Sequence, residues 1–281
     1  MVASAFFFSL MSLLVKLAGN RLPSQEIVLV RGVITLGLSY WLIRRAAISP
    51  WGTRRGLLLF RGLSGFAALS CFYYSLTHLP LAEATVIQYL NPIFTALLAA
   101  WFLRERAGWV VVLGATLGLI GTTLVARPAV FFGGLAAPLA LGPVVIALAG
   151  AVFSAVAYVT VRRLGATEHP LVTVFYFPLV TVPATLPFLA GGWVWPTAAE
   201  WLVLLGVGVT TQVGQVYLTQ GLMLEPAGRA TTVAYTQILF AAVWGALVFA
   251  DYPDVWLAAG AVLVMAGTLV VAVSRRERAS A

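Results

Sequence analysis

The residues best suited to bind a polar solute are amides and phenols that recur along one side of otherwise apolar segments. The two longest stripes hold Thr85, Gln88, Tyr89 and Asn91 in the first half of the chain, and Thr231, Tyr235 and Gln237 in the second. On a helix of 3.6 residues per turn each stripe occupies one side, and apolar residues occupy the other. Amides and hydroxyls both donate and accept hydrogen bonds, so the chemistry on offer is recognition of a polar solute.

Two further stripes have helical spacing, and they leave two interpretations open. They consist of Gln212, Gln215 and Thr219 in one segment, and of Ser70, Tyr74 and Thr77 in another, which His78 follows. In lipid, such side chains either line a water-filled cavity or hydrogen-bond between helices. For any single residue we favour the interhelical bond, and for the two repeat-related stripes with amides and tyrosines we favour the cavity. The predicted solute-binding residues are Tyr74, His78, Gln88, Tyr89, Asn91, Gln212, Gln215, Tyr235 and Gln237.

Three prolines are predicted to bend helices or to gate the site. Pro92 has no amide hydrogen, so it frees a backbone carbonyl in mid-segment that can bend the helix or contact a ligand. Pro178 and Pro183 share one segment and predict a bent helix there, with ordinary kinks as the alternative reading.

The ionisable residues argue against proton coupling and against catalysis. No Asp or Glu falls in the middle of an apolar segment, so the usual carrier of a coupling proton is missing. Arg31 and Arg61 lie within two turns of segment ends, and we expect both side chains to snorkel to the interface. One cysteine and two histidines form no catalytic or metal-binding motif, so we expect no enzyme, no metal and no cofactor.

The elements that position these residues must lie in a membrane. Hydrophobic residues make up 61% of the chain and charged residues 9%, against roughly a quarter charged in a soluble domain. The apolar surplus has to face a lipid bilayer. The net charge of +8 is spread over short clusters between apolar runs, which excludes nucleic-acid binding as the function.

Ten apolar segments are long enough to cross a hydrocarbon core of about 30 Å as helices. They lie at 2–18, 27–45, 56–77, 81–103, 108–126, 142–163, 170–190, 199–221, 228–250 and 255–274. The connections between them are short and leave no room for a soluble domain. We therefore predict an all-α integral membrane protein with ten transmembrane helices.

The arginines in the connections predict the orientation of these helices. One side of the membrane receives Arg44, Arg45, Arg54, Arg55, Arg104, Arg106, Arg162, Arg163, Arg229, Arg275, Arg276 and Arg278. The other side receives only Arg21 and Arg127. Because basic residues concentrate in cytoplasmic loops, both termini are predicted to be cytoplasmic.

An internal repeat divides the chain into two halves. An offset of 146 residues carries Pro80, Tyr89, Glu105, Gly114 and Gly121 onto Pro226, Tyr235, Asp251, Gly260 and Gly267. Each half holds five spans, an odd number, so the second half must enter the membrane inverted. The predicted domains are a first five-helix repeat at 1–127, a connecting loop at 128–141 and a second, inverted repeat at 142–281.

The repeat also carries a recognisable motif. It comprises Leu79-Pro80-Leu81-Ala82-Glu83-Ala84, Tyr89, Asn91-Pro92-Ile93-Phe94, Glu105, Gly114, Gly118 and Gly121. This pattern resembles the EamA-type branch of the drug/metabolite transporter superfamily over nearly the whole chain, although Ile238 stands where the second half would repeat Pro92. The resemblance implies a carrier that moves small metabolites outward across a bacterial inner (plasma) membrane. Within that branch the chain resembles the YddG-like subgroup, a resemblance that implies export of amino acids, including aromatic ones.

Inverted repeats, polar stripes and this resemblance together predict alternating access around a central cavity. Amino acids, including aromatic or other apolar ones, are the leading small-molecule cargo because amides and tyrosines can hold a zwitterion and its side chain. Nucleosides, drugs and other small metabolites fit the same residues, and a membrane scaffold without cargo is the non-transport alternative. A single chain supplies all these residues, so no oligomer is required.

Overall fold

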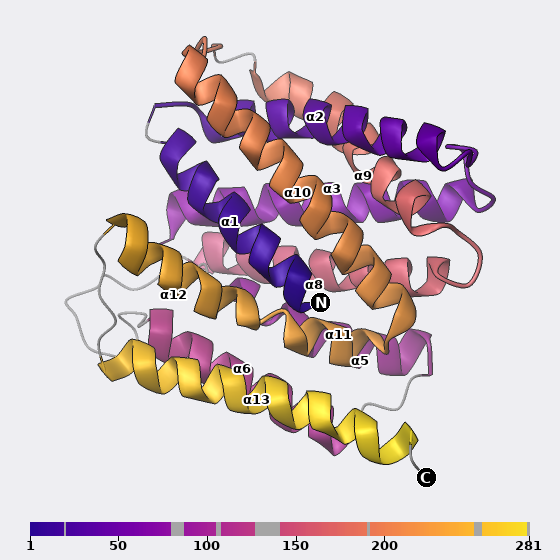
Figure 1. The fold of residues 1–281 in the computed structure, drawn as a ribbon, viewed down its shortest axis with the longest axis vertical. Helices are drawn as coiled ribbons and strands as arrows, with labels where there is room; N and C mark the ends of the chain where they lie inside the picture. Colours follow the sequence, from indigo (N-terminus) through magenta and orange to yellow (C-terminus); the bar gives the residue numbers. More distant parts are fainter. Residues whose placement is uncertain are drawn as a thin grey trace.

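The computed structural model describes residues 1–19, 21–79, 87–104, 108–126, 141–189, 192–249 and 255–279. All regular elements in these ranges are helical (Figure 1). The helices of the first half are α1 (Val2–Ala18), α2 (Ser24–Arg45), α3 (Arg55–His78), α5 (Asn91–Phe102) and α6 (Trp109–Ala126). Those of the second are α8 (Leu141–Leu164), α9 (Pro170–Thr185), η1 (Leu186–Leu189), α10 (Ala198–Leu224), α11 (Ala227–Val233), α12 (Thr236–Phe249) and α13 (Val255–Ala279).

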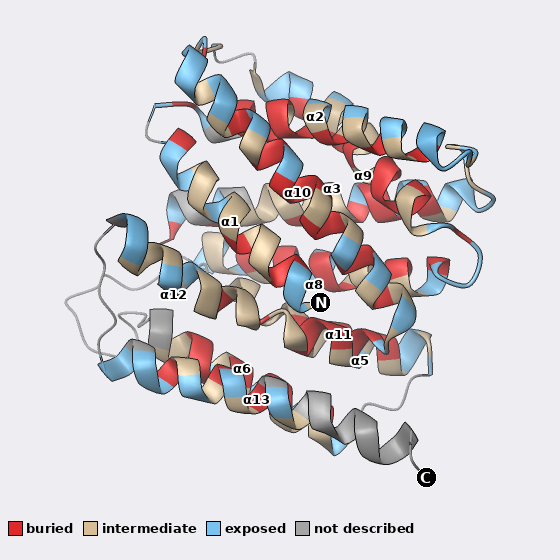
Figure 2. Cartoon of the chain, in the orientation of Figure 1, coloured by how far each residue is buried: buried red, intermediate tan, exposed pale blue. Residues whose placement is uncertain are grey.

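The apolar surface of this bundle is that of a membrane protein. Within the described ranges, six helical segments are long and apolar enough to span a bilayer, and four shorter apolar helices accompany them. Large side chains such as Trp101, Leu202 and Leu247 are more than two-thirds exposed, and exposed residues follow the outside of the bundle (Figure 2). Such surface is stable only against lipid. The predicted all-α integral membrane fold is confirmed.

The helix contacts are symmetric under the exchange of the two halves. Helix α3 packs on α8 and on α9, and their counterparts pair in the same way, α10 with α1 and with α2. Helix α5 packs on α8 as α12 packs on α1, whereas α2 with α9 and α6 with α13 each pair with their own counterpart. Contacts that map onto themselves in this way define an approximate twofold axis. The two inverted repeats therefore form one bundle rather than two separate domains.

Glycines make the contact between α6 and α13 close and reciprocal. A Cβ atom on Gly121 would lie 2.6 Å from the carbonyl oxygen of Gly260. A Cβ on Gly267, its counterpart, would lie 2.7 Å from the carbonyl oxygen of Gly114. All four residues belong to the predicted repeat. Small residues let helix backbones approach in lipid, where packing rather than the hydrophobic effect drives association.

The fourth and ninth spans are interrupted, which corrects the prediction of continuous helices at 81–103 and 228–250. In the ninth span α11 ends at Val233, a turn covers Ala234 and Tyr235, and α12 begins at Thr236. In the fourth span a turn at residues 89–90 precedes α5, whose first turn contains Pro92. Proline is favoured there because the first amides of a helix have no intrahelical acceptor. Pro92 thus follows the break instead of bending a continuous helix.

Two repeat-related tyrosines hold these interruptions together. The amide of Ile93 bonds to the Leu90 carbonyl at 3.0 Å, so the Tyr89 carbonyl lacks the partner that a continuous helix would supply. The Tyr235 hydroxyl donates to that carbonyl at 2.8 Å, and the two rings stack with centroids 5.6 Å apart. The ninth-span residue Tyr235 thus satisfies the carbonyl that the break in the fourth span leaves unpaired.

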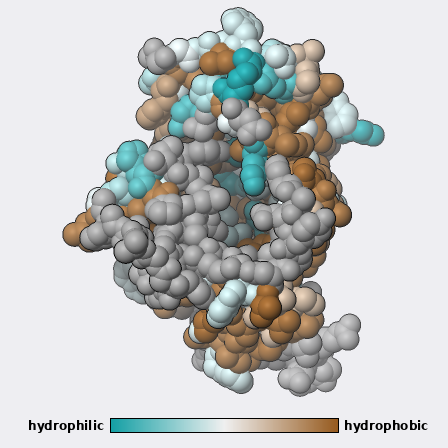
Figure 3. Space-filling model, turned by 90° about the vertical axis from the view of Figure 1, so that its left-hand side faces the viewer, coloured by the Kyte–Doolittle hydropathy of each residue, from teal (hydrophilic) through white to brown (hydrophobic). Residues whose placement is uncertain are grey.

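The basic helix ends gather at one end of the bundle. Because successive helices alternate in direction, the ends of α2 and α8 and the starts of α3 and α11 lie on the same side, at the right of Figure 1. The opposite face, turned toward the viewer in Figure 3, is hollowed near its centre. On that side the Arg21 guanidinium donates to the Glu200 carboxylate at 2.8 Å, a hydrogen bond that raises the pKa of Arg21. We call the end with the basic helix ends the inner end, and the opposite, hollowed end the outer end.

Several sequence predictions fall outside the described residues. These include residues 128–140 of the connecting loop predicted at 128–141, Thr85 of the fourth-span stripe, and the acidic residues Glu83, Glu105 and Asp251. The domain limits at 127 and 142 stay predictions. The second repeat begins, in the described part of the chain, with α8 at Leu141.

The glycine contact predicts a stability difference between matched variants. Gly121→Ala and Gly267→Ala should each destabilise the bundle by about 1–3 kcal/mol, because the added methyl group meets a backbone carbonyl that cannot move aside. Gly37→Ala is the control, since a Cβ there meets nothing within 4 Å. Thermal unfolding of the purified protein in detergent measures the difference. Equal midpoints for all three variants would show that the close approach contributes nothing.

Candidate functional site

A cavity of about 150 Å³ lies inside the bundle, between helices of both halves. Its walls come from α1, α3, α8, α9 and α10, with Gln88 from the residues that precede the break in the fourth span. The lining residues are Phe8, Arg61, Gly65, Ala68, Leu69, Phe72, Gln88, Ser154, Ala157, Tyr158, Phe177, Gln215 and Leu218.

The cavity sits on the approximate twofold axis. Three pairs of lining residues are separated by the 146-residue offset of the repeat: Phe8 with Ser154, Leu69 with Gln215, and Phe72 with Leu218. Residues related by the repeat can line one cavity only where the two halves meet at their axis. Two of the three pairs also differ in polarity, because the second half supplies Ser154 and Gln215 where the first half supplies apolar residues. The cavity is therefore symmetric in position but not in polarity.

Two of the predicted solute-binding residues line this cavity. The amide of Gln88 donates to the Ser154 hydroxyl at 3.2 Å, a bond that joins the fourth-span break to α8. Gln215 is buried on α10, so this residue comes from the second half of the chain. Tyr158 adds a phenol to the lining. These groups give the cavity several hydrogen-bonding atoms at separate points of its wall.

Arg61 is the cationic residue of the cavity, and the prediction that it snorkels is wrong. Its side chain is 3% exposed, and the guanidinium carbon lies 4.6 Å from the centre of the Phe177 ring. Arg31 is also buried, at 8% exposure. Both residues lie within two turns of a helix end, but neighbouring helices cover their side of the bundle. The distance of an arginine from the end of its helix can be read from the sequence, but the burial of its side chain by neighbouring helices cannot.

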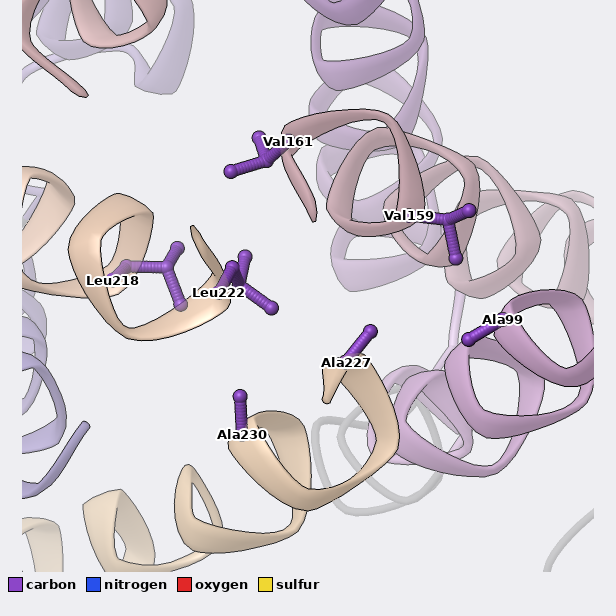
Figure 4. Close-up of a cluster of buried hydrophobic side chains, with 7 residues drawn as sticks. All are labelled: Ala99, Val159, Val161, Leu218, Leu222, Ala227 and Ala230. Atoms are coloured by element: carbon purple, nitrogen blue, oxygen red, sulfur yellow. The ribbon is translucent and has the colours of Figure 1, made fainter. Parts of the chain in front are cut away.

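The cavity is closed toward the inner end by apolar side chains. Leu218 lines the cavity and also belongs to a buried cluster drawn from α5, α8, α10 and α11 (Figure 4). The members of this cluster are Ala99, Val159, Val161, Leu218, Leu222, Ala227 and Ala230. Leu222 and Ala227 are fully buried, so the cluster excludes water between the cavity and the inner end. The structure thus represents a state closed on the inner side.

The other predicted residues lie away from the cavity lining. Gln212 accepts a hydrogen bond from the Ser39 hydroxyl at 3.0 Å, which is the interhelical role that we considered as the alternative. Tyr89 and Tyr235 pair with each other at the span breaks. Tyr74 and His78 are exposed on α3 and stack with ring centroids 3.9 Å apart.

The remaining predicted residues flank the breaks or lie on α9. Asn91 opens α5 and Gln237 lies in the first turn of α12, neither of them in the cavity wall. Pro178 and Pro183 both lie inside α9, the first buried and the second exposed. A gating role for these prolines stays a prediction.

Most residues of the cavity wall are not among the predicted solute-binding residues, although some of them carry a signal in the sequence. Ser154 and Tyr158 are spaced i, i+4 and form a polar stripe on α8 like those of the other spans. Gly65 follows Arg61 by one helical turn, a spacing that leaves room beside a long side chain. No comparable pattern marks Phe8, Phe72 or Phe177, because aromatic residues are abundant throughout the apolar segments.

Four carboxylates in the described part of the chain are engaged near helix ends. Glu200 pairs with Arg21, and Glu225 lies 3.8 Å from Arg229. Glu26 accepts from the Val194 amide at 3.0 Å, and Glu168 accepts from the Thr53 amide at 2.8 Å. None of these four groups lines the cavity. Among the residues that the structure describes, no cluster of His, Cys, Asp and Glu is arranged to hold a metal ion.

Comparison with known proteins gives the family and the fold. The EamA-like transporter family matches residues 1–127 and 141–273. The chain is 35% identical over 280 residues to the pseudopaline exporter CntI of Pseudomonas aeruginosa, covering 99% of this chain and 95% of that protein. It is 29% identical to human solute carrier family 35 member G1, covering 99% and 79%. A protein of known crystal structure shares the fold with a TM-score of 0.83 at 21% identity, covering 98% of both chains.

The matches span both halves, as the internal repeat and the twofold packing require. The bacterial relative is named as a pseudopaline exporter, so the comparisons support the EamA-like family, and the YddG-like subgroup stays a prediction. An apolar helical bundle with a polar cavity on its axis fits a carrier and not an enzyme. This chain is a multi-pass membrane transporter of small metabolites and belongs to the EamA-like transporter family.

Proposed function

We propose that this transporter exports small metabolites of the amino-acid type by alternating access around the axial cavity. The observation that carries the proposal is the cavity itself, which lies on the twofold axis and takes polar groups from both halves. Inverted repeats can exchange conformations about such an axis, so that one site opens to each side in turn. The apolar cluster around Leu222 is then the inner gate, and it must part to admit a solute.

The size and lining of the cavity support a small cargo. A cavity of about 150 Å³ holds a molecule of the size of benzene, whereas drug-sized ligands need roughly 300–1,000 Å³. Phe8, Phe72 and Phe177 offer an apolar wall, while Gln88 and Gln215 offer hydrogen bonds. An amino acid with an apolar side chain has both kinds of surface. Nucleosides and drugs fit this volume less well.

The similarity to CntI supports a second candidate cargo. That relative is named as a pseudopaline exporter and matches this chain over nearly its whole length. Pseudopaline, or a metabolite related to it, is therefore the cargo to test beside amino acids. A scaffold without cargo is the remaining alternative, and it predicts no solute flux at all.

Location and direction follow from the same reasoning. We infer that the protein lies in a bacterial inner (plasma) membrane with both termini in the cytoplasm, so that the inner end faces the cytoplasm. The exposed arginines at that end support this orientation, and the bacterial relative supports export. The cavity is formed within one chain, so transport does not require an oligomer.

The first prediction for transport concerns the cavity amides. Gln215→Ala should weaken solute affinity about tenfold in counterflow assays with purified protein in liposomes, because one buried hydrogen bond to the solute is lost. Gln220→Ala, on an exposed face of the same helix, is the matched control and should behave as wild type. A panel of amino acids, nucleosides, cationic dyes and pseudopaline identifies the cargo. Exchange of another class without amino acids would refute the amino-acid assignment.

The second prediction separates the tyrosine pair from the solute site. Tyr235→Phe removes the hydrogen bond to the Tyr89 carbonyl at the span break, at a cost of about 1 kcal/mol. We expect a changed maximal rate of counterflow and a KM close to wild type, because the pair holds the breaks and does not line the cavity. If KM rises as much as in Gln215→Ala, the ring contacts the solute and the assignment is wrong.

The third prediction concerns energy coupling. None of the described carboxylates lies in the cavity, so we expect solute to move down its own gradient without an accompanying proton. Liposomes that contain a pH-sensitive dye, clamped at zero membrane potential, should show no proton influx when solute is added. A solute-dependent proton flux that the cargo itself cannot carry would contradict this expectation.

A further inference from the structure

Arg61 carries a positive charge that the surrounding protein does not neutralise. Its Nε and Nη1 atoms are buried and have no hydrogen-bond partner, and no described carboxylate lies in the cavity. A buried charge without a counterion is costly in a membrane protein, and it persists where it marks a functional site. The cavity is therefore a positively charged space with unused hydrogen-bond donors.

The position of the guanidinium is fixed by its neighbours. Its carbon lies 4.6 Å from the centre of the Phe177 ring, so the ring face supports the cation. A Cβ on Gly65 would lie 3.0 Å from Nη1 and 2.9 Å from the Phe177 ring, so only glycine leaves this space open. A Cβ on Gly62 would lie 2.6 Å from Val180, which brings α3 close to α9 beside the site.

The other polar groups around Arg61 are neutral and cannot replace a counterion. The cavity offers the amides of Gln88 and Gln215, the hydroxyl of Ser154 and the phenol of Tyr158. Gln88 and Ser154 already bond to each other. A guanidinium that stacks on a ring still presents paired N–H groups, whose geometry matches a carboxylate.

We propose that Arg61 is the anchor for a carboxylate group of the transported solute. This inference rests on the proposed function and adds the chemical class of the cargo, a small carboxylate or zwitterion. The carboxylate would receive hydrogen bonds from the unpaired N–H groups of the guanidinium, while the apolar part of the solute packs on Phe8 and Phe72 on other parts of the wall. The cargo then supplies the counterion for the Arg61 guanidinium.

Benzoate and benzamide test this assignment because they have the same shape and differ in charge. Binding is measured on purified protein in detergent as stabilisation against thermal unfolding. We expect benzoate to stabilise the wild type more than benzamide does. Arg61→Met should weaken benzoate binding about tenfold to a hundredfold and leave benzamide unchanged, since charged hydrogen bonds are lost without loss of volume. Arg163→Met, which removes an exposed arginine, is the matched control.

Two more variants keep the test decisive if Arg61→Met fails to fold. Arg61→Lys retains the charge but not the paired donors, so benzoate affinity should fall between wild type and Arg61→Met. Gly65→Ala retains Arg61 but forces its guanidinium to shift, so this variant should also bind benzoate more weakly. Gly56→Ala is its control on the same helix, because a Cβ there meets nothing within 4 Å.

The outcomes separate this inference from the proposed function. Equal benzoate affinity in wild type and the Arg61 and Gly65 variants, or no stabilisation of the wild type by benzoate up to its solubility limit, overturns the carboxylate anchor. Benzoate binding that depends on Arg61, combined with no amino-acid exchange in liposomes, keeps the anchor and refutes the amino-acid cargo. Amino-acid exchange that is unaffected by Arg61→Met keeps the exporter and refutes the anchor.

Discussion

Hydrocarbon offers no hydrogen-bond partners, so each polar group inside a spanning bundle must be paired within the protein or reach a water-filled space. This constraint explains why the polar residues of both halves converge on one axis. Some of them pair between helices, as Ser39 does with Gln212, and Tyr235 with the Tyr89 carbonyl. Gln215 and Arg61 lie instead in the wall of the cavity, where a solute can complete their hydrogen bonding.

The same constraint explains where the transmembrane spans can be interrupted. A break in a helix exposes backbone groups, and lipid cannot satisfy them, so breaks persist only where protein or a cavity lies alongside. Both breaks occur at repeat-related tyrosines that contact each other at the axis. The inner gate lies on the helices next to these breaks, because α5 and α11 contribute Ala99, Ala227 and Ala230 to it. Movement at the breaks is therefore suited to open or close the inner end.

The fold was predictable from the sequence to a greater extent than the site. Long apolar segments and the 146-residue offset predict the spans and their inverted pairing, because both are carried by patterns of many residues. The burial of Arg61 and the break at Tyr235 depend on which helices cover a given side, and that is a property of the packed bundle. Gln212 and Gln215 illustrate the limit, since one stripe on one helix contains both an interhelical bond and a cavity residue.

Alternating exposure of the axial cavity is the central claim, and thiol labelling tests it most directly. Cys71 is the single cysteine of the chain, so a Cys71→Ser background allows one reporter to be added by Ala157→Cys, on the cavity wall. Membrane-impermeant thiol reagents are then applied to right-side-out and to inverted vesicles. The account predicts labelling from both sides, slowed in each case by the transported solute. Labelling from one side only, in a variant that still transports, would contradict it.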